Sequence, residues 1–142
     1  YLDATVNESL RRRPVLPIAE PRLVKKEVEI GGWRYEPGCA LALSAYLVHH
    51  DPDVYDDPYA FRPERFLDEP PGTYTWIPFG GGIRRCLGAA LAMAEQRVVL
   101  GTMARRLDLV ADDPEPERAV HRNVTMIPSR GARVVVRRKA RC

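Results

Sequence analysis

Apolar residues recur every four positions at the start of the chain. Leu2, Val6 and Leu10 would therefore lie on one face of a helix, and Pro14 would end it. We expect a helix over residues 1–13. Two more prolines follow closely, and each disfavours helical backbone at the residue before it. The segment after the helix is therefore expected to be extended and irregular.

The next segment alternates between apolar and charged residues, so residues 23–30 predict a β-strand. Gly31 and Gly32 predict a tight hairpin turn, with residues 33–35 as the returning strand. Residues 40–47 are apolar, which indicates either a buried strand or a strand that passes into a short helix. A small β-region is thus expected after the first helix.

The second half of the chain begins with a long segment rich in proline and aspartate. Residues 51–71 also carry aromatic side chains, which favour an ordered, packed loop over a flexible linker. Residues 87–107 give the clearest helical pattern of the chain, with an apolar face. A polar turn over residues 112–117 and a strand over residues 133–136 are expected to follow.

The composition is that of an ordinary globular chain, with 45% hydrophobic and 29% charged residues among 142. The net charge of +3 does not call for a nucleic-acid partner. No apolar run approaches the roughly 20 residues that cross a bilayer, and no signal-peptide pattern opens the chain. Because it begins without methionine and inside an expected helix, we expect a segment of a larger protein.

Three cysteines, Cys39, Cys86 and Cys142, occur without any CxxC pair. This argues against a disulfide framework and against a zinc ribbon. It favours a reducing compartment, and we expect a cytoplasmic location, with any membrane anchor outside this segment.

The loop around Cys86 has an unusual composition. Three glycines at positions 80–82 permit positive φ and the close approach of a flat ligand. Cys86 falls near the start of the predicted long helix, where free N–H groups and the helix dipole favour a thiolate, and Arg84 acts in the same direction. Gly88 leaves room for a group lying across the helix end. The plain alternative is a glycine-rich turn with a buried structural cysteine. A GxGxxG nucleotide motif fails because Arg85 occupies the third glycine position.

The pattern Phe-x-x-Gly-x-Arg-x-Cys-x-Gly over residues 79–88 resembles the haem-binding loop of the cytochrome P450 family. The resemblance implies that Cys86 is the thiolate ligand of haem iron, that Phe79 packs near it and that Arg84 approaches a haem propionate. Arg22 occupies the place of a second propionate-binding arginine in many relatives, although it could also be an exposed arginine at a strand edge. The residues thus assigned to the cofactor are Phe79, Gly80, Gly82, Arg84, Cys86, Gly88 and Arg22.

Two further motifs occur in the family's order. Glu8 and Arg11 resemble its ExxR helix, and residues 61–66 resemble its meander, in which Arg65 would complete a Glu8–Arg11–Arg65 network. An isolated ion pair at this spacing is usually a solvated surface pair. If the network is buried, breaking it leaves a charge unpaired, which is strongly destabilising.

One position departs from the family pattern. Soluble bacterial relatives often have His-Arg-Asp before the meander, and this chain has His49-His50-Asp51. We expect His49, His50 and His121 to be surface residues and not metal ligands.

The resemblance implies a mainly α fold with small β-sheets (α+β). It comprises the ExxR helix, a β-region, the meander, the cysteine loop, a long helix and a closing hairpin. Residues 1–142 would be the C-terminal segment of a single haem-thiolate oxygenase domain whose distal half lies elsewhere.

The expected activity of the complete enzyme is the hydroxylation of a small apolar organic substrate with O2. A ferredoxin- or flavodoxin-like protein would donate electrons, because no flavin or iron–sulfur motif is present. Two haem-based alternatives are a peroxide-driven or non-oxygenating enzyme and an inactive fragment that does not hold haem stably. The last alternative is a basic interaction module that uses residues 137–141 on nucleic acid or a membrane surface.

Overall fold

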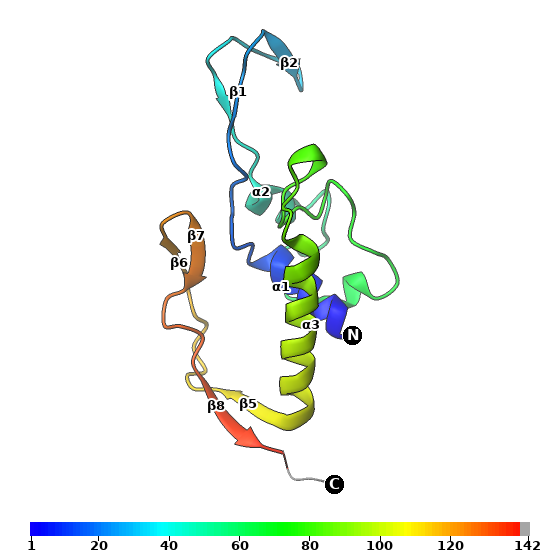
Figure 1. Cartoon of the computed structure of the whole chain (residues 1–142), viewed down its shortest axis with the longest axis vertical. Coiled ribbons are helices and arrows are strands. Elements are labelled where there is room, and N and C mark those ends of the chain that lie inside the picture. The colour runs from blue at the N-terminus through cyan, green and yellow to red at the C-terminus, as the bar shows by residue number, and fades with distance from the viewer. Residues whose placement is uncertain (140–142) are drawn as a thin grey trace.

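The computed structural model describes residues 1–139. Figure 1 shows an elongated molecule in which α3 runs beside α1, β1 and β2 project beyond one end, and β5 with β8 lies beyond the other. The elements in chain order are α1 (Leu2–Arg12), β1 (Arg22–Leu23), β2 (Val28–Ile30), β3 (Trp33–Tyr35), β4 (Ala40–Leu41), α2 (Ala45–His49), η1 (Pro63–Phe66), η2 (Gly82–Arg84), α3 (Ala89–Arg106), β5 (Leu107–Ala111), β6 (Ala119–Arg122), β7 (Thr125–Pro128) and β8 (Val134–Arg138).

Helix α1 is the centre of the packing, and its prediction is confirmed. It contacts α2, α3 and η1, which come from three distant parts of the sequence. It is close enough to α3 that a Cβ on Gly101 would lie 3.1 Å from the Leu2 side chain. The predicted apolar stripe is buried at Val6 and Leu10, but Glu8 and Arg11 are buried beside it. A polar group therefore lies inside this small core.

The single strand predicted over residues 23–30 is wrong. The structure divides it between β1, which pairs with β4, and β2, which pairs with β3. Between them, the Val24 N–H donates to the Cys39 carbonyl and the Gly38 N–H donates to the Val24 carbonyl, both near 2.9 Å. These bonds continue the contact between the β1 and β4 segments by one residue, and the alternating pattern therefore runs across two separate ladders.

The hairpin and the short helix after it agree with the sequence. Gly31 and Gly32 have φ of +59° and +80°, as the tight turn between β2 and β3 requires. Of the two alternatives for residues 40–47, the strand that passes into a helix is confirmed, because β4 leads to α2. The Ser44 side chain caps α2 by accepting a bond from the Leu47 N–H.

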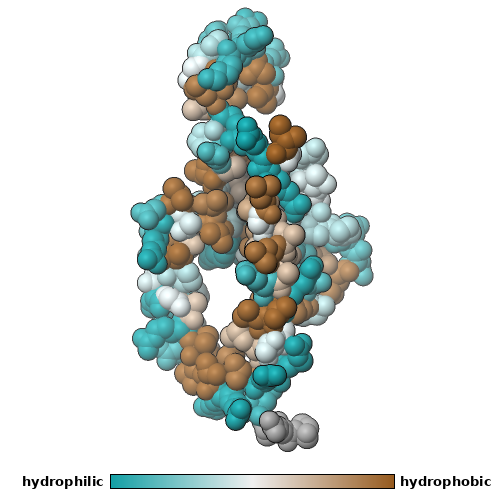
Figure 2. Space-filling model, viewed as in Figure 1, coloured by the Kyte–Doolittle hydropathy of each residue, from teal (hydrophilic) through white to brown (hydrophobic). Residues whose placement is uncertain are grey.

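Helix α3 begins at Ala89, two residues later than predicted, with Gly88 as its N-cap. It packs on α1 with small residues, including Gly101, while Leu91 and Val98 of its predicted apolar face stay about two-thirds exposed. Figure 2 shows apolar groups spread over the visible surface. None of the helices within residues 1–139 is long and apolar enough to span a bilayer.

Two small antiparallel ladders close the chain. β5 follows α3 directly and pairs with β8, which confirms the strand predicted near residues 133–136, and β6 forms a hairpin with β7. Arg137 and Arg138 of the predicted basic module lie in β8 opposite Asp108 and Leu107. The rest of that module after Lys139, and Cys142, lie outside the described residues.

Candidate functional site

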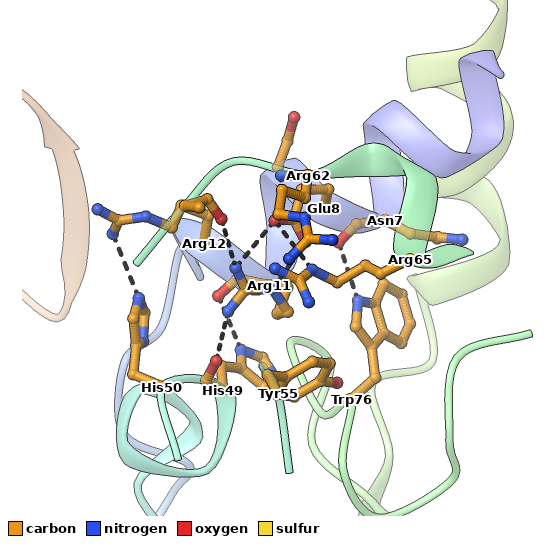
Figure 3. Close-up of polar contacts among 12 residues, drawn as sticks. Asn7, Glu8, Arg11, Arg12, His49, His50, Tyr55, Arg62, Arg65 and Trp76 are labelled. Atoms are coloured by element: carbon orange, nitrogen blue, oxygen red, sulfur yellow. Dashed lines mark hydrogen bonds and ion pairs between the residues drawn. The ribbon is translucent and has the colours of Figure 1, made fainter. Parts of the chain in front are cut away.

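A buried ion pair lies at the centre of the site (Figure 3). The Arg11 guanidinium donates two hydrogen bonds to the Glu8 carboxylate, from Nε to Oε2 at 2.7 Å and from Nη2 to Oε1 at 2.9 Å. Both side chains are 0% exposed. The remaining Arg11 donors reach the backbone carbonyls of His49 and Ala60. Arg11 therefore joins α1 to α2 and to the loop that precedes η1.

Arg65 of η1 reaches the same carboxylate, so the structure brings the three members of the predicted network together. Its Nε lies 3.4 Å from Glu8 Oε1, and the Arg62 N–H donates to the same oxygen at 2.8 Å. The Tyr55 ring lies beside both guanidiniums, 4.9 Å from that of Arg11 and 5.8 Å from that of Arg65. Burial raises the pKa of Glu8, but the hydrogen bonds from Arg11 and Arg62 outweigh it and the net pKa is lowered.

The prediction that His49 and His50 are surface residues is wrong. His49 is 0% and His50 6% exposed, because the end of α2 packs against α1. His121 of β6 is exposed, as predicted. In the sequence, a histidine before the proline-rich segment carries no mark that separates a buried ring from a solvated one.

His50 is enclosed by aromatic rings. It stacks on Tyr46 at 4.1 Å between centroids and lies 5.0 Å from the Tyr59 ring. Its Nδ1 lies 2.8 Å from the Tyr46 carbonyl and its Nε2 lies 3.2 Å from an Arg12 guanidinium nitrogen. Burial lowers the pKa of His50. The histidine thus accepts a bond from Arg12 in its neutral form, and it connects α2 to the end of α1.

Three successive residues before the cysteine loop are fixed to this buried region. The Thr75 carbonyl accepts the Tyr55 hydroxyl at 3.0 Å, and the Trp76 indole N–H donates to the Asn7 carbonyl at 2.9 Å. The Ile77 N–H donates to His49 Nε2 at 2.8 Å. Sequence reasoning did not identify these anchors. The aromatic residues near the loop were the only feature of the sequence that pointed to these contacts.

The cysteine loop, residues 79–88, has a defined backbone. Gly80 and Gly82 take φ of +69° and +62°, while Gly81 is extended. The Gly80 N–H donates to the Ile77 carbonyl at 3.0 Å, and the Cys86 N–H donates to the Phe79 carbonyl at 2.9 Å. Cys86 precedes the N-cap of α3 by two residues, so it lies just outside the helix and not in its first turn.

The surface beside Cys86 is open, and it carries exposed apolar side chains as well as the exposed Arg84 and Arg85. Cys86 is exposed, and the flanking Ile83 and Leu87 are fully exposed. A Cβ added to Gly80 or Gly82 would meet nothing within 4 Å, and one added to Gly88 would meet only the Cys86 sulfur, at 3.8 Å. A soft sulfur on an unobstructed surface with exposed apolar side chains beside it fits a flat, largely apolar cofactor with a metal at its centre.

The two predicted propionate ligands lie on different elements. Arg84 is exposed in η2, close to Cys86 in sequence. Arg22 is in β1, where it bonds to the carbonyl of Glu20 at 3.1 Å and pairs with the Glu20 carboxylate at 3.6 Å. Both guanidiniums remain accessible, and their contact with haem stays a prediction.

Comparison with known proteins identifies the family. The sequence model described as Cytochrome P450 matches residues 1–136. The chain belongs to the cytochrome P450 family. It is 42% identical over 134 residues to cytochrome P450 137 of Mycobacterium tuberculosis, covering 94% of this chain and 28% of that protein. It is 43% identical over 137 residues to cytochrome P450 135B1 of Mycobacterium bovis, covering 96% of this chain and 29% of that one.

Solved P450 structures confirm the predicted fold class. A cyanobacterial P450, CYP120A1, with bound retinoic acid superposes with a TM-score of 0.89 at 26% identity, covering 98% of this chain and 33% of that one. A zebra fish P450 with abiraterone gives 0.83 at 31% identity, covering 98% and 34%. This chain spans less than a third of the length of the two mycobacterial relatives.

Proposed function

We propose that this chain is the haem-binding C-terminal segment of a haem-thiolate monooxygenase domain, with Cys86 as the iron ligand. The proposal is supported most by the open, glycine-lined surface on which Cys86 is exposed beside the apolar side chains of Ile83 and Leu87. A structural cysteine would be enclosed by its own chain. Family membership supplies the nature of the cofactor.

The cofactor-binding residues divide by chemistry. Cys86 provides the anionic sulfur, Phe79 packs near it, and Gly80, Gly82 and Gly88 allow close approach. Arg84 and Arg22 are the cations for the two propionates, since a guanidinium suits carboxylates. Haem, when bound, supplies the oxygen activation that hydroxylates a small apolar substrate.

The Glu8–Arg11–Arg65 network connects α1 to α2 and to η1. Arg11 fixes α1 to α2, and Arg65 adds bonds to the Asp56 and Asp57 carbonyls. Because the segment before the cysteine loop is bonded to the same elements, the network keeps the loop in one position. Its role is to position the site.

The complete enzyme would use O2, a small-molecule substrate and a ferredoxin- or flavodoxin-like electron donor in the cytoplasm. Arg84 and Arg85 are exposed beside Cys86 and would attract an acidic donor protein. Most of the substrate pocket would come from the distal part of the domain, which does not lie in this segment.

A second candidate is an inactive fragment that does not hold haem stably. The large apolar side chains exposed along α3 and β8 favour it, because exposed apolar surface makes an isolated chain prone to aggregate. In that case the P450 membership would describe ancestry only.

The test is haem reconstitution of the purified chain, followed by the absorption spectrum of the reduced, carbon-monoxide-bound form. We expect a strongly red-shifted Soret band that Cys86→Ala abolishes. Cys39→Ala is the matched control, because Cys39 is also exposed but lies before β4, away from the loop. A band that survives Cys86→Ala, or is lost equally in Cys39→Ala, would refute Cys86 as the ligand. No band in any variant would favour the inactive fragment.

A further inference from the structure

One buried histidine joins α1 to the segment that precedes the cysteine loop. His49 Nδ1 lies 3.1 Å from the Arg11 carbonyl, and its Nε2 accepts the Ile77 N–H at 2.8 Å. In return, the Arg11 guanidinium donates to the His49 carbonyl. Ile77 is only 4% exposed, so its amide has no ready access to water as an alternative partner. Figure 3 shows the imidazole beneath α1, beside the buried ion pair.

These partners fix both the charge and the tautomer of the ring. A backbone N–H can only donate and a carbonyl can only accept, so Nε2 carries a lone pair and Nδ1 carries the hydrogen. A second proton would set an N–H of the ring against the N–H of Ile77. The neighbouring groups are Arg11 and Glu8 of α1 and His50, the residue that follows α2. The net pKa of His49 is lowered to about 4: burial is the main cause and the charges of Arg11 and His50 act with it, whereas the hydrogen bond to the Arg11 carbonyl and the Glu8 carboxylate oppose the shift.

The contact continues into the loop through its backbone. The Ile77 carbonyl accepts the Gly80 N–H, and the Phe79 carbonyl accepts the Cys86 N–H. Glycines at positive φ give the loop little stiffness of its own, so its geometry depends on its two ends. The start of α3 fixes one end, where the Ala89 N–H donates to the Cys86 carbonyl at 3.3 Å. The Ile77 amide belongs to the other end.

We propose that His49 is a positioning residue for the cysteine loop, holding Ile77 against α1 as a neutral imidazole with hydrogen on Nδ1. Its effect on the loop backbone follows from the protein contacts alone, whereas its effect on haem ligation rests on the proposed function. His50 beside it is also buried, but it bonds to Tyr46 and Arg12 and not to the loop.

Two substitutions separate the two bonds of the ring. His49→Gln can place an amide oxygen near the position of Nε2 and keep the bond to the Ile77 N–H. His49→Asn can keep a donor near Nδ1 but offers Ile77 no acceptor. We expect the Ile77 amide to exchange hydrogen about tenfold faster in His49→Asn than in His49→Gln, as the loss of one hydrogen bond implies. His50→Phe, which retains a ring for stacking, should leave the Ile77 rate unchanged. Equal Ile77 rates in His49→Asn and the unchanged chain would overturn the proposal.

A measurement on the unchanged chain avoids any folding defect of the variants. Nitrogen-15 spectra should show His49 with a protonated Nδ1 and a bare Nε2 at pH 7, unchanged at pH 5.5. A hydrogen on Nε2, or a ring already protonated at pH 5.5, would overturn the proposal.

Haem reconstitution distinguishes the two proposals. We expect His49→Asn to lower the fraction of the chain that gives the thiolate-type carbon-monoxide spectrum, and His49→Gln to restore it. If the unchanged chain gives no such spectrum, the proposed function fails, while the exchange result still decides the role of His49 in the loop. If the unchanged chain gives the spectrum and His49→Asn matches it in both spectrum and exchange, the inference about His49 fails.

Discussion

Around Glu8 and Arg11 the polar groups are buried and paired, whereas around Cys86 the apolar groups face outward. Within residues 1–139, no buried side-chain nitrogen or oxygen lacks a hydrogen-bond partner. By contrast, Ile83 and Leu87 beside the sulfur are fully exposed. The first region is complete within this chain, and the second offers a surface for something else to cover.

This difference distinguishes the region that stabilises the fold, around Glu8 and Arg11, from the region proposed to bind haem, around Cys86. A buried ion pair adds little net stability, but removing one partner is costly because a charge stays behind in the interior. An exposed loop with glycines at positive φ contributes little to stability and can be shaped for a ligand. Substitutions in the first region should therefore change unfolding, and those in the second should change haem binding.

The largest effect is expected from Glu8→Ala. It leaves the Arg11 guanidinium buried without its carboxylate, so we expect a loss of about 3–5 kcal/mol in the free energy of unfolding in urea. The control is Asp3→Ala, which breaks the ion pair between Asp3 of α1 and Arg97 of α3. That pair is about half exposed, so about 0.5 kcal/mol or less is expected. Similar losses in the two variants would contradict the distinction between buried and exposed pairs.

The second prediction concerns the stability of the folded chain at acidic pH. The pKa of His49 in the folded chain, about 4, lies below its ordinary value of 6.5, so the unfolded chain takes up a proton first as the pH falls. Stability is therefore retained above pH 6.5 and lost between pH 6.5 and 4, by about 3 kcal/mol from this residue. Urea unfolding at several pH values measures the loss, and His49→Gln should show a shallower dependence. An equal dependence in both would show that His49 is not buried as a neutral ring.

A third prediction tests the open region. Gly82→Ala places an L-residue at φ +62°, at a cost of about 1–2 kcal/mol, although its Cβ would meet no atom within 4 Å. We expect about tenfold weaker haem affinity in a titration. Gly81→Ala is the matched control, because Gly81 is extended and any residue adopts that backbone. Equal affinities for the two variants would show that the loop backbone does not set the haem surface.

The smallest effect is expected at the junction of the two regions. Trp76→Phe removes the indole N–H that bonds to the Asn7 carbonyl, so we expect a loss of about 1 kcal/mol in unfolding free energy. Tyr74→Phe should have no measurable effect, because Tyr74 is exposed. A Trp76→Phe variant as stable as the parent would show that this bond does not hold the loop to α1.

Local pattern predicted the elements that form from neighbouring residues. The helix ending at Pro14 and the turn at Gly31 and Gly32 follow from backbone preferences that act within a few residues. The division of residues 23–30 was not predictable in this way. It depends on the pairing of β1 with β4, which lies beyond the hairpin of β2 and β3.

The site was predictable where a residue pattern is specific and not where burial decides. The spacing from Phe79 to Gly88 led to the family, and Glu8, Arg11 and Arg65 are brought together as their motifs imply. The burial of His49 and His50 and the exposure of the larger residues of α3 depend on how α1 packs against its neighbours. Periodicity gives the face of a helix but not the partner that covers it.

The most direct test of the contrast between the two regions is residue-resolved hydrogen exchange of the chain with and without haem. We predict slow exchange around Glu8 and Arg11 in both states, with residues 80–88 becoming protected only when haem is added. Fast exchange around Glu8 and Arg11 until haem is present would contradict the account, as would a cysteine loop whose exchange haem leaves unchanged.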